Sequence, residues 1–259
     1  MAGSGKPSEG ANDFEIFDHR EAAHLERAPC LWSRMRQSPT LPHSSNYGGF
    51  YIATRFDDVE AITRNHEVFS SASGISFPAL DFGIPLIPAE VDPPLHNDYR
   101  GLLARFFTRK YVEALEPTFR QMARDLLDGF QDRSRVDFVD VFARPLPVYV
   151  SLELMGLPRE DAPYLDGLVH DLHKARGTKQ GARAAQAFQS YLETKLIQHE
   201  KVARDPAESV LSAVVLGEVQ GRRMTLEERT SMIRLLLFGG FDTTSISLAT
   251  AMWWLATHP

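Results

Sequence analysis

The sequence of 259 residues contains only one cysteine, Cys30, so no disulfide can form within the chain. A lone cysteine is typical of proteins from reducing compartments, and we expect a cytoplasmic location. Positive charge is also scarce: the chain has 28 lysine and arginine residues and 34 aspartate and glutamate residues, which gives a net charge of −6. Nucleic-acid binding proteins usually carry a basic excess, so the charge argues against that class.

The N-terminal segment lacks the apolar stretch of a secretory signal peptide. Residues 1–13 are rich in glycine and polar residues, and we expect a disordered tail there. The apolar run at residues 233–256 is long enough to be considered as a membrane span, but Asp242 and several hydroxyl residues interrupt its middle. Hydrocarbon penalises such groups by a few kcal/mol, so we predict a buried core helix and no membrane association.

Hydrophobic spacing predicts a mainly helical chain with little sheet. Residues 50–54 are expected to form a short strand, and residues 136–141 a strand or extended segment. Residues 69–91 form a long irregular segment in which serine, glycine and proline alternate with large apolar residues, and such segments often belong to binding sites. Helices are expected at residues 14–37, 57–65, 119–130, 146–155, 159–174, 182–202, 207–216 and 226–256.

The last of these helices is expected to begin with a capping box, in which Thr225 and Glu228 each satisfy a backbone N–H. Its middle carries the sequence GGFDTT at residues 239–244. Two glycines cost a helix about 2 kcal/mol relative to two alanines, and a buried carboxylate costs more unless it is paired. Clusters that break helix rules in this way often mark function.

Two interpretations of this cluster remain open. In the structural one, the glycines allow a close helix crossing, the hydroxyls bond back to carbonyls of the preceding turn, and Asp242 pairs with an arginine. In the functional one, a small ligand approaches Gly239 and Gly240, and Asp242 and Thr243 hand protons to it.

A second cluster, DPPLHNDYR at residues 92–100, suggests the start of another helix. Asp92 suits the N-cap and Pro93 the first helical position, where no N–H is needed. His96 and Arg100 then lie one turn apart on one face and can aim two donors at one anionic group. The alternative is an ordinary solvated face with a salt bridge.

Together the two clusters resemble those of cytochrome P-450, in particular its soluble bacterial haem-thiolate monooxygenases. Supporting fragments occur in the family's order: GGFY at 48–51, TRFDDV at 54–59, FSS at 69–71 and LEP at 115–117. The resemblance implies a mainly α, P-450-like helical fold with a small N-terminal β region. Residues 14–259 would form the N-terminal portion of a single domain.

The resemblance also implies roles for six residues and a haem b cofactor. His96 and Arg100 would hydrogen-bond the haem propionates, and Gly239 and Gly240 would lie over the distal face of the ring. Asp242 and Thr243 would deliver the protons that cleavage of the oxygen–oxygen bond consumes.

The substrate would be a small apolar molecule lying between the central helix and the irregular segment. Plain core packing is the alternative explanation for each residue of the candidate wall. His170 and His173 are three residues apart, but the lack of a third ligand nearby argues against a metal site. The candidate wall consists of Phe77, Ile84, Leu86, Ile87, Leu235 and Phe238.

Electrons would come from a ferredoxin-type protein or a flavin reductase. Arg105, Arg109 and Lys110 form a local basic patch that suits docking of an acidic partner. A solvated helix end is the alternative interpretation of this patch.

The 259 residues contain neither the family's F-G-x-G-x3-C loop, which supplies the iron ligand, nor its E-x-x-R helix. Cys30 lies in an expected helix without a glycine loop, and we predict a small packed side chain there. We therefore expect a fragment that lacks the C-terminal part, binds haem weakly if at all, and does not catalyse the reaction. The alternatives are a haem-free helical binding or scaffold protein and a peroxide-using variant of the family. The presence of both Asp242 and Thr243 argues against the peroxide-using variant.

Overall fold

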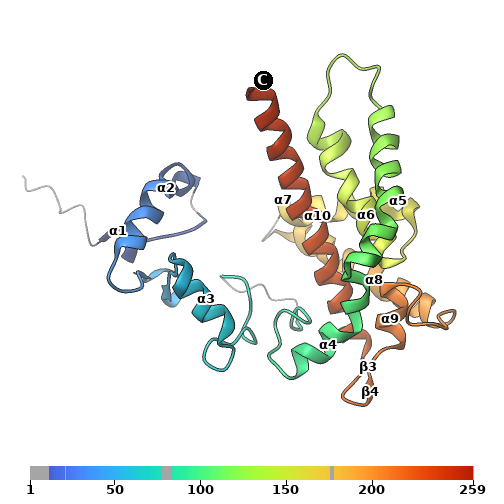
Figure 1. Cartoon of the computed structure of the whole chain (residues 1–259), viewed down its shortest axis with the longest axis horizontal. Helices are drawn as coiled ribbons and strands as arrows, with labels where there is room; N and C mark the ends of the chain where they lie inside the picture. Colours follow the sequence, from blue (N-terminus) through green and yellow to red (C-terminus); the bar gives the residue numbers. More distant parts are fainter. Residues whose placement is uncertain (1–11, 21, 78–82, 176–177, 259) are drawn as a thin grey trace, which may run out of the picture. The chain divides into compact units, whose positions relative to one another are not determined.

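The computed structural model describes residues 12–20, 22–77, 83–175 and 178–258. Most of these residues are helical, as the sequence predicts. The chain divides into two compact units, one of residues 1–71 and 76–80 and the other of residues 72–75 and 81–259 (Figure 1). Residues 1–11 of the expected disordered tail lie outside the described residues, whereas Asn12 begins the first helix.

The described residues of the first unit form three α-helices, one short 3-10 helix and a small sheet. Its elements are α1 (Asn12–Glu15), α2 (Ala22–Gln37), β1 (His43–Ser44), η1 (Asn46–Gly48), β2 (Phe50–Tyr51) and α3 (Phe56–Arg64). Strand β1 pairs antiparallel with β2, which confirms a small N-terminal β region, although each strand has only two residues. A small core of Phe17, Leu31, Met35 and Ile52 holds the unit together.

Two expectations for this unit are wrong. The helix expected at residues 14–37 is interrupted between α1 and α2, where Asp18 Oδ1 accepts a hydrogen bond from Arg20 N at 2.9 Å. Such local side-chain bonds compete with helix formation. Cys30 is exposed, not packed, because Leu31 and Met35 occupy the inward face of α2.

The second unit is almost entirely helical. Helix α7 packs against α8, and the long α10 packs against α6, α8 and α9 (Figure 1). Its elements are α4 (Leu95–Leu103), η2 (Ala104–Phe107), α5 (Arg109–Asp128), η3 (Val139–Ala143), α6 (Pro145–Met155), η4 (Arg159–Asp161), α7 (Ala162–Lys174), α8 (Lys179–Glu200), α9 (Val210–Leu216), β3 (Glu218–Val219), β4 (Arg222–Arg223) and α10 (Leu226–Thr257).

The strand or extended segment expected at residues 136–141 is wrong, because η3 is a π-helical turn. The Asp137 carboxylate accepts a hydrogen bond from Val139 N at 2.9 Å, and Arg144 N donates to Val139 O at 3.0 Å. The expected end of α6 is confirmed, since Gly156 follows it with a φ of 80°. A left-handed residue of this kind commonly ends a helix, and glycine adopts it without steric cost.

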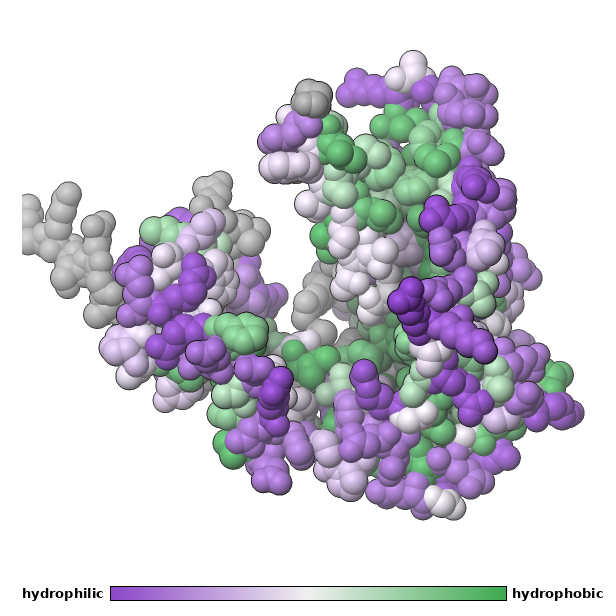
Figure 2. Space-filling view, in the orientation of Figure 1, coloured by the Kyte–Doolittle hydropathy of each residue, from purple (hydrophilic) through white to green (hydrophobic). Residues whose placement is uncertain are grey.

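Helix α10 begins with the expected capping box, in which Thr225 and Glu228 bond each other's backbone N–H groups at 3.2 and 2.7 Å. Its first turns are buried, as predicted for a core helix, but its C-terminal half is exposed. Ile246 is 66% exposed and Leu255 is 64% exposed. Figure 2 shows hydrophobic residues at the surface around this half of the helix. By length and composition α10 passes a test for membrane-spanning helices, which core helices of soluble proteins also pass.

Candidate functional site

Helix α4 carries the first predicted pair of residues but begins later than expected. It starts at Leu95, so the expectation that Asp92 caps it with Pro93 in first position is wrong. The backbone explains the difference, because His96 N bonds to Asp92 O at 3.0 Å and closes a turn that leaves both prolines ahead of the helix. His96 and Arg100 nevertheless lie one turn apart in α4, as predicted.

These two side chains differ in their surroundings. The His96 ring is half-buried, and its Nδ1 hydrogen-bonds Pro88 O at 3.0 Å. Arg100 is exposed. An exposed guanidinium one turn from an imidazole leaves donors available to an anionic ligand.

Tyr99, between the two predicted residues, ties α4 to the start of α10. It is 1% exposed, and its hydroxyl donates to Glu228 Oε1 at 2.6 Å. Arg222 donates to both oxygens of the same carboxylate at 2.7 Å. Burial, together with the bonded Glu228 carboxylate, raises the pKa of Tyr99 to about 12. Arg222 is the main cause that lowers the pKa of Glu228 to about 2.

The sequence analysis assigned Glu228 only to the capping box and missed this long-range cluster. The cluster joins residues more than a hundred positions apart, and spacing within one segment carries no signal for such a pair. Its consequence is that the capping carboxylate of α10 also fixes the helix that carries His96 and Arg100.

Residues 83–91 of the irregular segment are fastened to one face of α10. Ser231 Oγ accepts a hydrogen bond from Ile87 N at 2.9 Å and donates one to Pro85 O at 2.5 Å. Ser231, Leu235, Gly239 and Thr243 are spaced by four residues, so each shares a face of α10 with the next, one turn along. The segment thus meets the face two turns before the first glycine.

A buried glutamate holds the same segment from within. Glu90 is 6% exposed, and its carboxylate accepts hydrogen bonds from Leu86 N at 2.7 Å and from Ile75 N at 3.1 Å. The sequence analysis did not single out Glu90 or Ser231. Leu86 and Ile87 are each only 5% exposed, so the segment contributes to the core as well as to any pocket wall.

The two glycines of α10 have different neighbours. A Cβ placed on Gly240 would lie 2.5 Å from Ser151 Oγ of α6, so this glycine permits a close helix crossing. A Cβ on Gly239 would meet nothing within 4 Å among the described residues, and Gly239 is exposed. The structural interpretation therefore applies to Gly240, and Gly239 leaves an open face.

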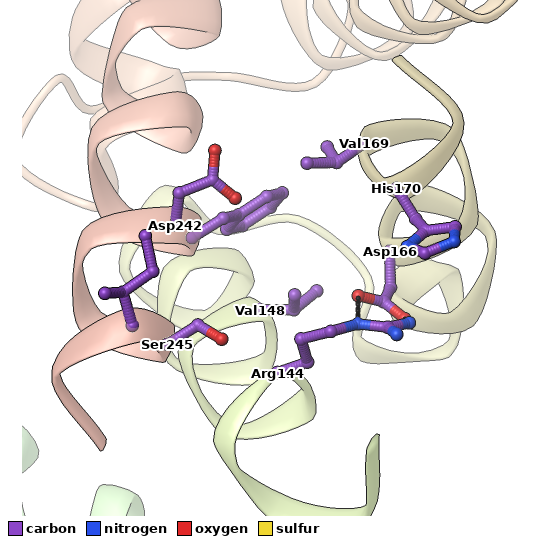
Figure 3. A pocket seen from close by; sticks show the side chains of 9 residues that line it. Arg144, Val148, Asp166, Val169, His170, Asp242 and Ser245 are labelled. Carbon is purple, nitrogen blue, oxygen red and sulfur yellow. Dashed lines mark hydrogen bonds and ion pairs between the residues drawn. The ribbon is translucent and has the colours of Figure 1, made fainter. Parts of the chain in front are cut away.

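The acid and the alcohol that follow also have different surroundings. Thr243 is exposed, and its hydroxyl donates to Gly239 O at 2.7 Å. Asp242 instead lines a cavity of about 320 Å³ between α10, α6 and α7 (Figure 3). The other residues lining this cavity are Arg144, Val148, Asp166, Val169, His170, Phe241, Ser245 and Ile246.

Charged groups line one side of this cavity. Arg144 donates to Asp166 at 2.6 and 3.3 Å, and its third nitrogen donates to Asp140 at 2.9 Å (Figure 3). His170 is exposed at the cavity, whereas the side chain of His173 lies outside the described residues. A cavity of this size lined by ionisable groups has room for several water molecules.

Some of the candidate wall residues lie on α10 or in the segment that bonds to it. Leu235 lies on the face of α10 shared with Gly239, and Ile84, Leu86 and Ile87 belong to the segment fastened to that face. Phe238 stacks on Phe188 of α8, with ring centroids 5.2 Å apart, which is a core-type contact.

Phe77 belongs to the first unit, where its ring lies 4.8 Å from that of Phe50 and 5.7 Å from that of Tyr47. Phe77 and the other wall residues therefore belong to different units, and its place in the wall stays a prediction.

The predicted basic patch is exposed on η2 and α5. Arg105, Arg109 and Lys110 are all accessible, and Arg109 forms an ion pair with Glu113 at 2.7 Å. Two of the three cations have no ion pair recorded within the described residues, so the patch remains basic.

These features fit a flat ligand that carries carboxylates. An open glycine and an exposed hydroxyl share one face of α10, while an imidazole and a guanidinium stand on α4. The donors suit the propionates of haem, and the bare glycine suits a ring face. The iron ligand expected for such a group is not among the 259 residues.

Comparison with known proteins agrees with this arrangement. A family model described as Cytochrome P450 matches residues 170–259. A probable cytochrome P450 127A1 of Sinorhizobium fredii is 32% identical over 212 residues, covering 82% of this chain and 50% of that protein. Cyclomarin C epoxidase of Salinispora arenicola is 31% identical over 214 residues, covering 79% of this chain and 54% of the other.

Solved structures show the same fold. The bottromycin biosynthetic protein SalCYP superposes with a TM-score of 0.80 at 24% identity, covering 94% of this chain and 60% of that one. A myxobacterial cytochrome P450 in complex with myristic acid gives a TM-score of 0.74 at 26% identity, covering 92% and 62%. The chain spans about half the length of the curated relatives that it matches. On its sequence and its fold together, this chain belongs to the cytochrome P450 family.

Proposed function

We propose that residues 14–259 form the N-terminal portion of a single haem monooxygenase domain and contribute the distal side of its haem site. Membership of the family supports a haem-dependent oxidoreductase that incorporates oxygen from O2. The observation that carries the proposal is the difference between the two glycines, because Gly239 leaves an open face of α10 where Gly240 is needed for packing. Among the described residues, nothing lies close enough to position 239 to require glycine there.

In this proposal His96 and Arg100 bind the haem carboxylates, and Gly239 and Gly240 form the backbone next to the ring. Haem, when bound, supplies the iron at which dioxygen is activated and one oxygen atom is inserted into a C–H bond. The chain's own part is to orient the ring and to exclude water from its apolar side.

Asp242 and Thr243 move protons. The cavity beside Asp242 gives its carboxylate access to solvent, from which it takes up a proton. Thr243 lies on the adjacent face, with its hydroxyl hydrogen on Gly239 O and its oxygen lone pairs available as acceptors. A proton taken up at Asp242 passes to the ligand side of α10 through this hydroxyl or a water bound to it.

The substrate proposed is a small apolar molecule. Leu235 and the segment fastened by Ser231 form the apolar part of its wall, namely Ile84, Leu86 and Ile87. Phe238 and Phe77 remain candidate wall residues, supported only by their place in the sequence. A related solved structure holds myristic acid, a largely apolar molecule.

The electron donor proposed is a ferredoxin-type protein or a flavin reductase, docking on the exposed patch of Arg105, Arg109 and Lys110. An acidic partner would be attracted to this basic patch and repelled by the rest of the chain, which is acidic overall. A cytoplasmic location accompanies this proposal.

Catalysis by these 259 residues alone is not expected, because they contain no F-G-x-G-x3-C loop to supply the thiolate. They retain the groups that hold the ring, so weak haem binding is the activity to measure.

The proposal is tested by titrating haem into two matched variants, Gly239→Leu and Gly167→Leu. Both glycines are exposed in helices, and a Cβ on either meets nothing within 4 Å in the described parts of the chain. We expect Gly239→Leu to weaken haem binding about tenfold or more by overlapping the ring, and Gly167→Leu to leave it unchanged. Equal affinities of the two variants would contradict the proposed site.

A further inference from the structure

The hydrogen bond of His96 determines which of its ring nitrogens carries a proton. Nδ1 lies 3.0 Å from Pro88 O, and a carbonyl oxygen only accepts hydrogen bonds. Nδ1 must therefore carry a hydrogen whenever this contact is formed. In the neutral ring the other nitrogen, Nε2, is then an acceptor with no hydrogen.

A neutral His96 in this state cannot donate to a carboxylate. Nε2 would present a lone pair to the carboxylate oxygen, and two acceptors at hydrogen-bond distance repel each other. Rotating the ring by 180° about its Cβ–Cγ bond would put carbon atoms in the positions of the two nitrogens. The hydrogen bond to Pro88 O would then be broken. The imidazolium form carries N–H groups on both nitrogens and can bond Pro88 and a carboxylate at the same time.

We propose that His96 binds a carboxylate of the ligand only as an imidazolium, so that ligand binding at α4 takes up a proton. Arg100 contributes at every physiological pH because a guanidinium does not lose its proton. The inference rests on the proposed function in one respect, namely that the ligand is haem with its two carboxylates.

The backbone around His96 is held firmly enough to keep this geometry. Tyr99, three residues along α4, is anchored to Glu228, and Leu103 is buried one turn further. Pro88 lies in the segment fastened by Glu90 and Ser231. The contact between Nδ1 and Pro88 therefore joins two fixed parts of the structure.

Charged groups of both signs lie on α4 and on the elements packed against it. Arg100 lies one turn after His96 on α4, and Asp92 lies one turn before it. The Glu90 carboxylate is engaged by two backbone N–H groups, and the Glu228 carboxylate by Arg222. Within the described part of the chain, further charged groups are Asp98 on α4, Arg105 on the adjoining η2 and Glu218 on the adjoining β3.

The first arm of the test determines the tautomer of His96 in the ligand-free chain. Long-range ¹H–¹⁵N correlation spectra at about pH 8.5 assign the nitrogen that carries the hydrogen in a neutral ring. We expect the hydrogen on Nδ1. A neutral His96 with its hydrogen on Nε2 would overturn the inference whether or not the chain binds haem.

The second arm compares haem with haem dimethyl ester, whose carboxylates are blocked, between about pH 5.5 and 8.5. We expect the affinity for haem to fall about ten- to a hundredfold as the pH rises over this range, because one charge-assisted hydrogen bond is lost. The affinity for the ester should change little. His96→Gln keeps a side-chain N–H donor that does not titrate, so its affinity for haem should be nearly independent of pH.

The outcomes separate this inference from the proposed function. Haem binding by the wild type with the same pH dependence as the ester, or as His96→Gln, overturns the inference and leaves the haem site intact. If Gly239→Leu does not weaken haem binding, the proposed site is contradicted. The tautomer of His96 still tests the inference about its protonation in that case.

Discussion

Gly239 and Gly240 are chemically identical neighbours with different physical reasons for being glycine. Gly240 lies where α10 crosses α6 closely, and a methyl group there would meet Ser151 Oγ. Gly239 has room for a side chain, and no close contact among the described residues offsets the entropy cost of its glycine. At the residue scale, we interpret this cost at Gly239 as evidence that a ligand lies against this face of α10.

The difference predicts unequal effects of alanine at the two positions. Gly239→Ala should raise the free energy of unfolding by up to about 1 kcal/mol, because alanine favours helix. Gly240→Ala should be less stable than Gly239→Ala by about 1–2 kcal/mol, since its methyl group must displace the Ser151 hydroxyl. Urea unfolding of each variant measures the difference.

A Ser151→Ala background provides the control for this prediction. Without the hydroxyl, the nearest side-chain atom is Ser151 Cβ at 3.6 Å, an ordinary contact. The penalty at Gly240 should then disappear. If it persisted, the close crossing would not explain Gly240.

At the element scale, the site depends on how α4 and the irregular segment are fastened to α10. Glu228 accepts hydrogen bonds from Tyr99, Arg222 and Thr225 N, so one carboxylate caps α10 and anchors α4. Ser231, one turn later, holds the backbone of the segment at Ile87. Both anchors lie within the first two turns of α10.

The sequence could predict features of α6 and α10 that depend on residues close together in the chain. The capping box, the end of α6 at Gly156 and the unusual GGFDTT run follow from local chemistry, and the structure contains all three. The anchors through Glu90, Ser231 and Tyr99 depend on residues far apart in the chain, so no local spacing announces them. Which of the two glycines meets α6 is likewise a property of packing.

The Glu228 anchor predicts a pH dependence of stability. The pKa of Glu228 is lowered from 4.5 to about 2 in the folded chain, so the anchor stabilises the fold above about pH 4.5 and is lost as the pH falls toward 2. Allowing for solvent screening, Glu228→Gln should lower the free energy of unfolding by about 1–2 kcal/mol at pH 7.

Urea unfolding between pH 7 and about pH 3 follows this difference. Wild type and Glu228→Gln should converge as the pH falls, because protonated Glu228 and glutamine are similar. A constant difference at all pH values would show that the charge of Glu228 is not what anchors α4.

The Ser231 anchor predicts local opening of the irregular segment. Ser231→Ala removes the partner of the buried Ile87 N–H and of Pro85 O, a loss of about 1–3 kcal/mol. Hydrogen exchange at the Ile87 amide should accelerate accordingly. Ser247→Ala is the matched control, because Ser247 is exposed and its hydroxyl bonds Thr243 O of its own helix.

Unchanged exchange at Ile87 in Ser231→Ala would mean that the segment is held by other contacts. Faster exchange at Leu86 as well would show that the Glu90 and Ser231 anchors open together.

At the scale of the whole molecule, the chain carries one part of a family fold and spans about half the length of its curated relatives. Its sequence alone indicated the family, because the two motif clusters are local and specific. It predicted a buried core helix at residues 233–256, whereas Ile246, Trp253 and Leu255 in that range are exposed. The position of Phe77 relative to the other wall residues depends on how the two units pack, which no local pattern encodes.

The missing loop predicts the spectrum of the haem complex. The carbon-monoxide complex of the reduced, haem-loaded chain should lack the Soret shift of thiolate ligation, because no ligand loop is present. Cys30→Ala should leave that spectrum unchanged, since Cys30 is an exposed residue of α2. A thiolate-type spectrum that disappears in Cys30→Ala would identify Cys30 as an iron ligand.

The most direct test of the central claim is to locate bound haem by the paramagnetic broadening of backbone amide signals. We predict that ferric haem broadens the amides of Arg100, Gly239 and Thr243, and that diamagnetic zinc protoporphyrin does not. Broadening confined to the exposed apolar end of α10, around Trp253–Leu255, would show that haem only adheres to a hydrophobic surface and would contradict the account.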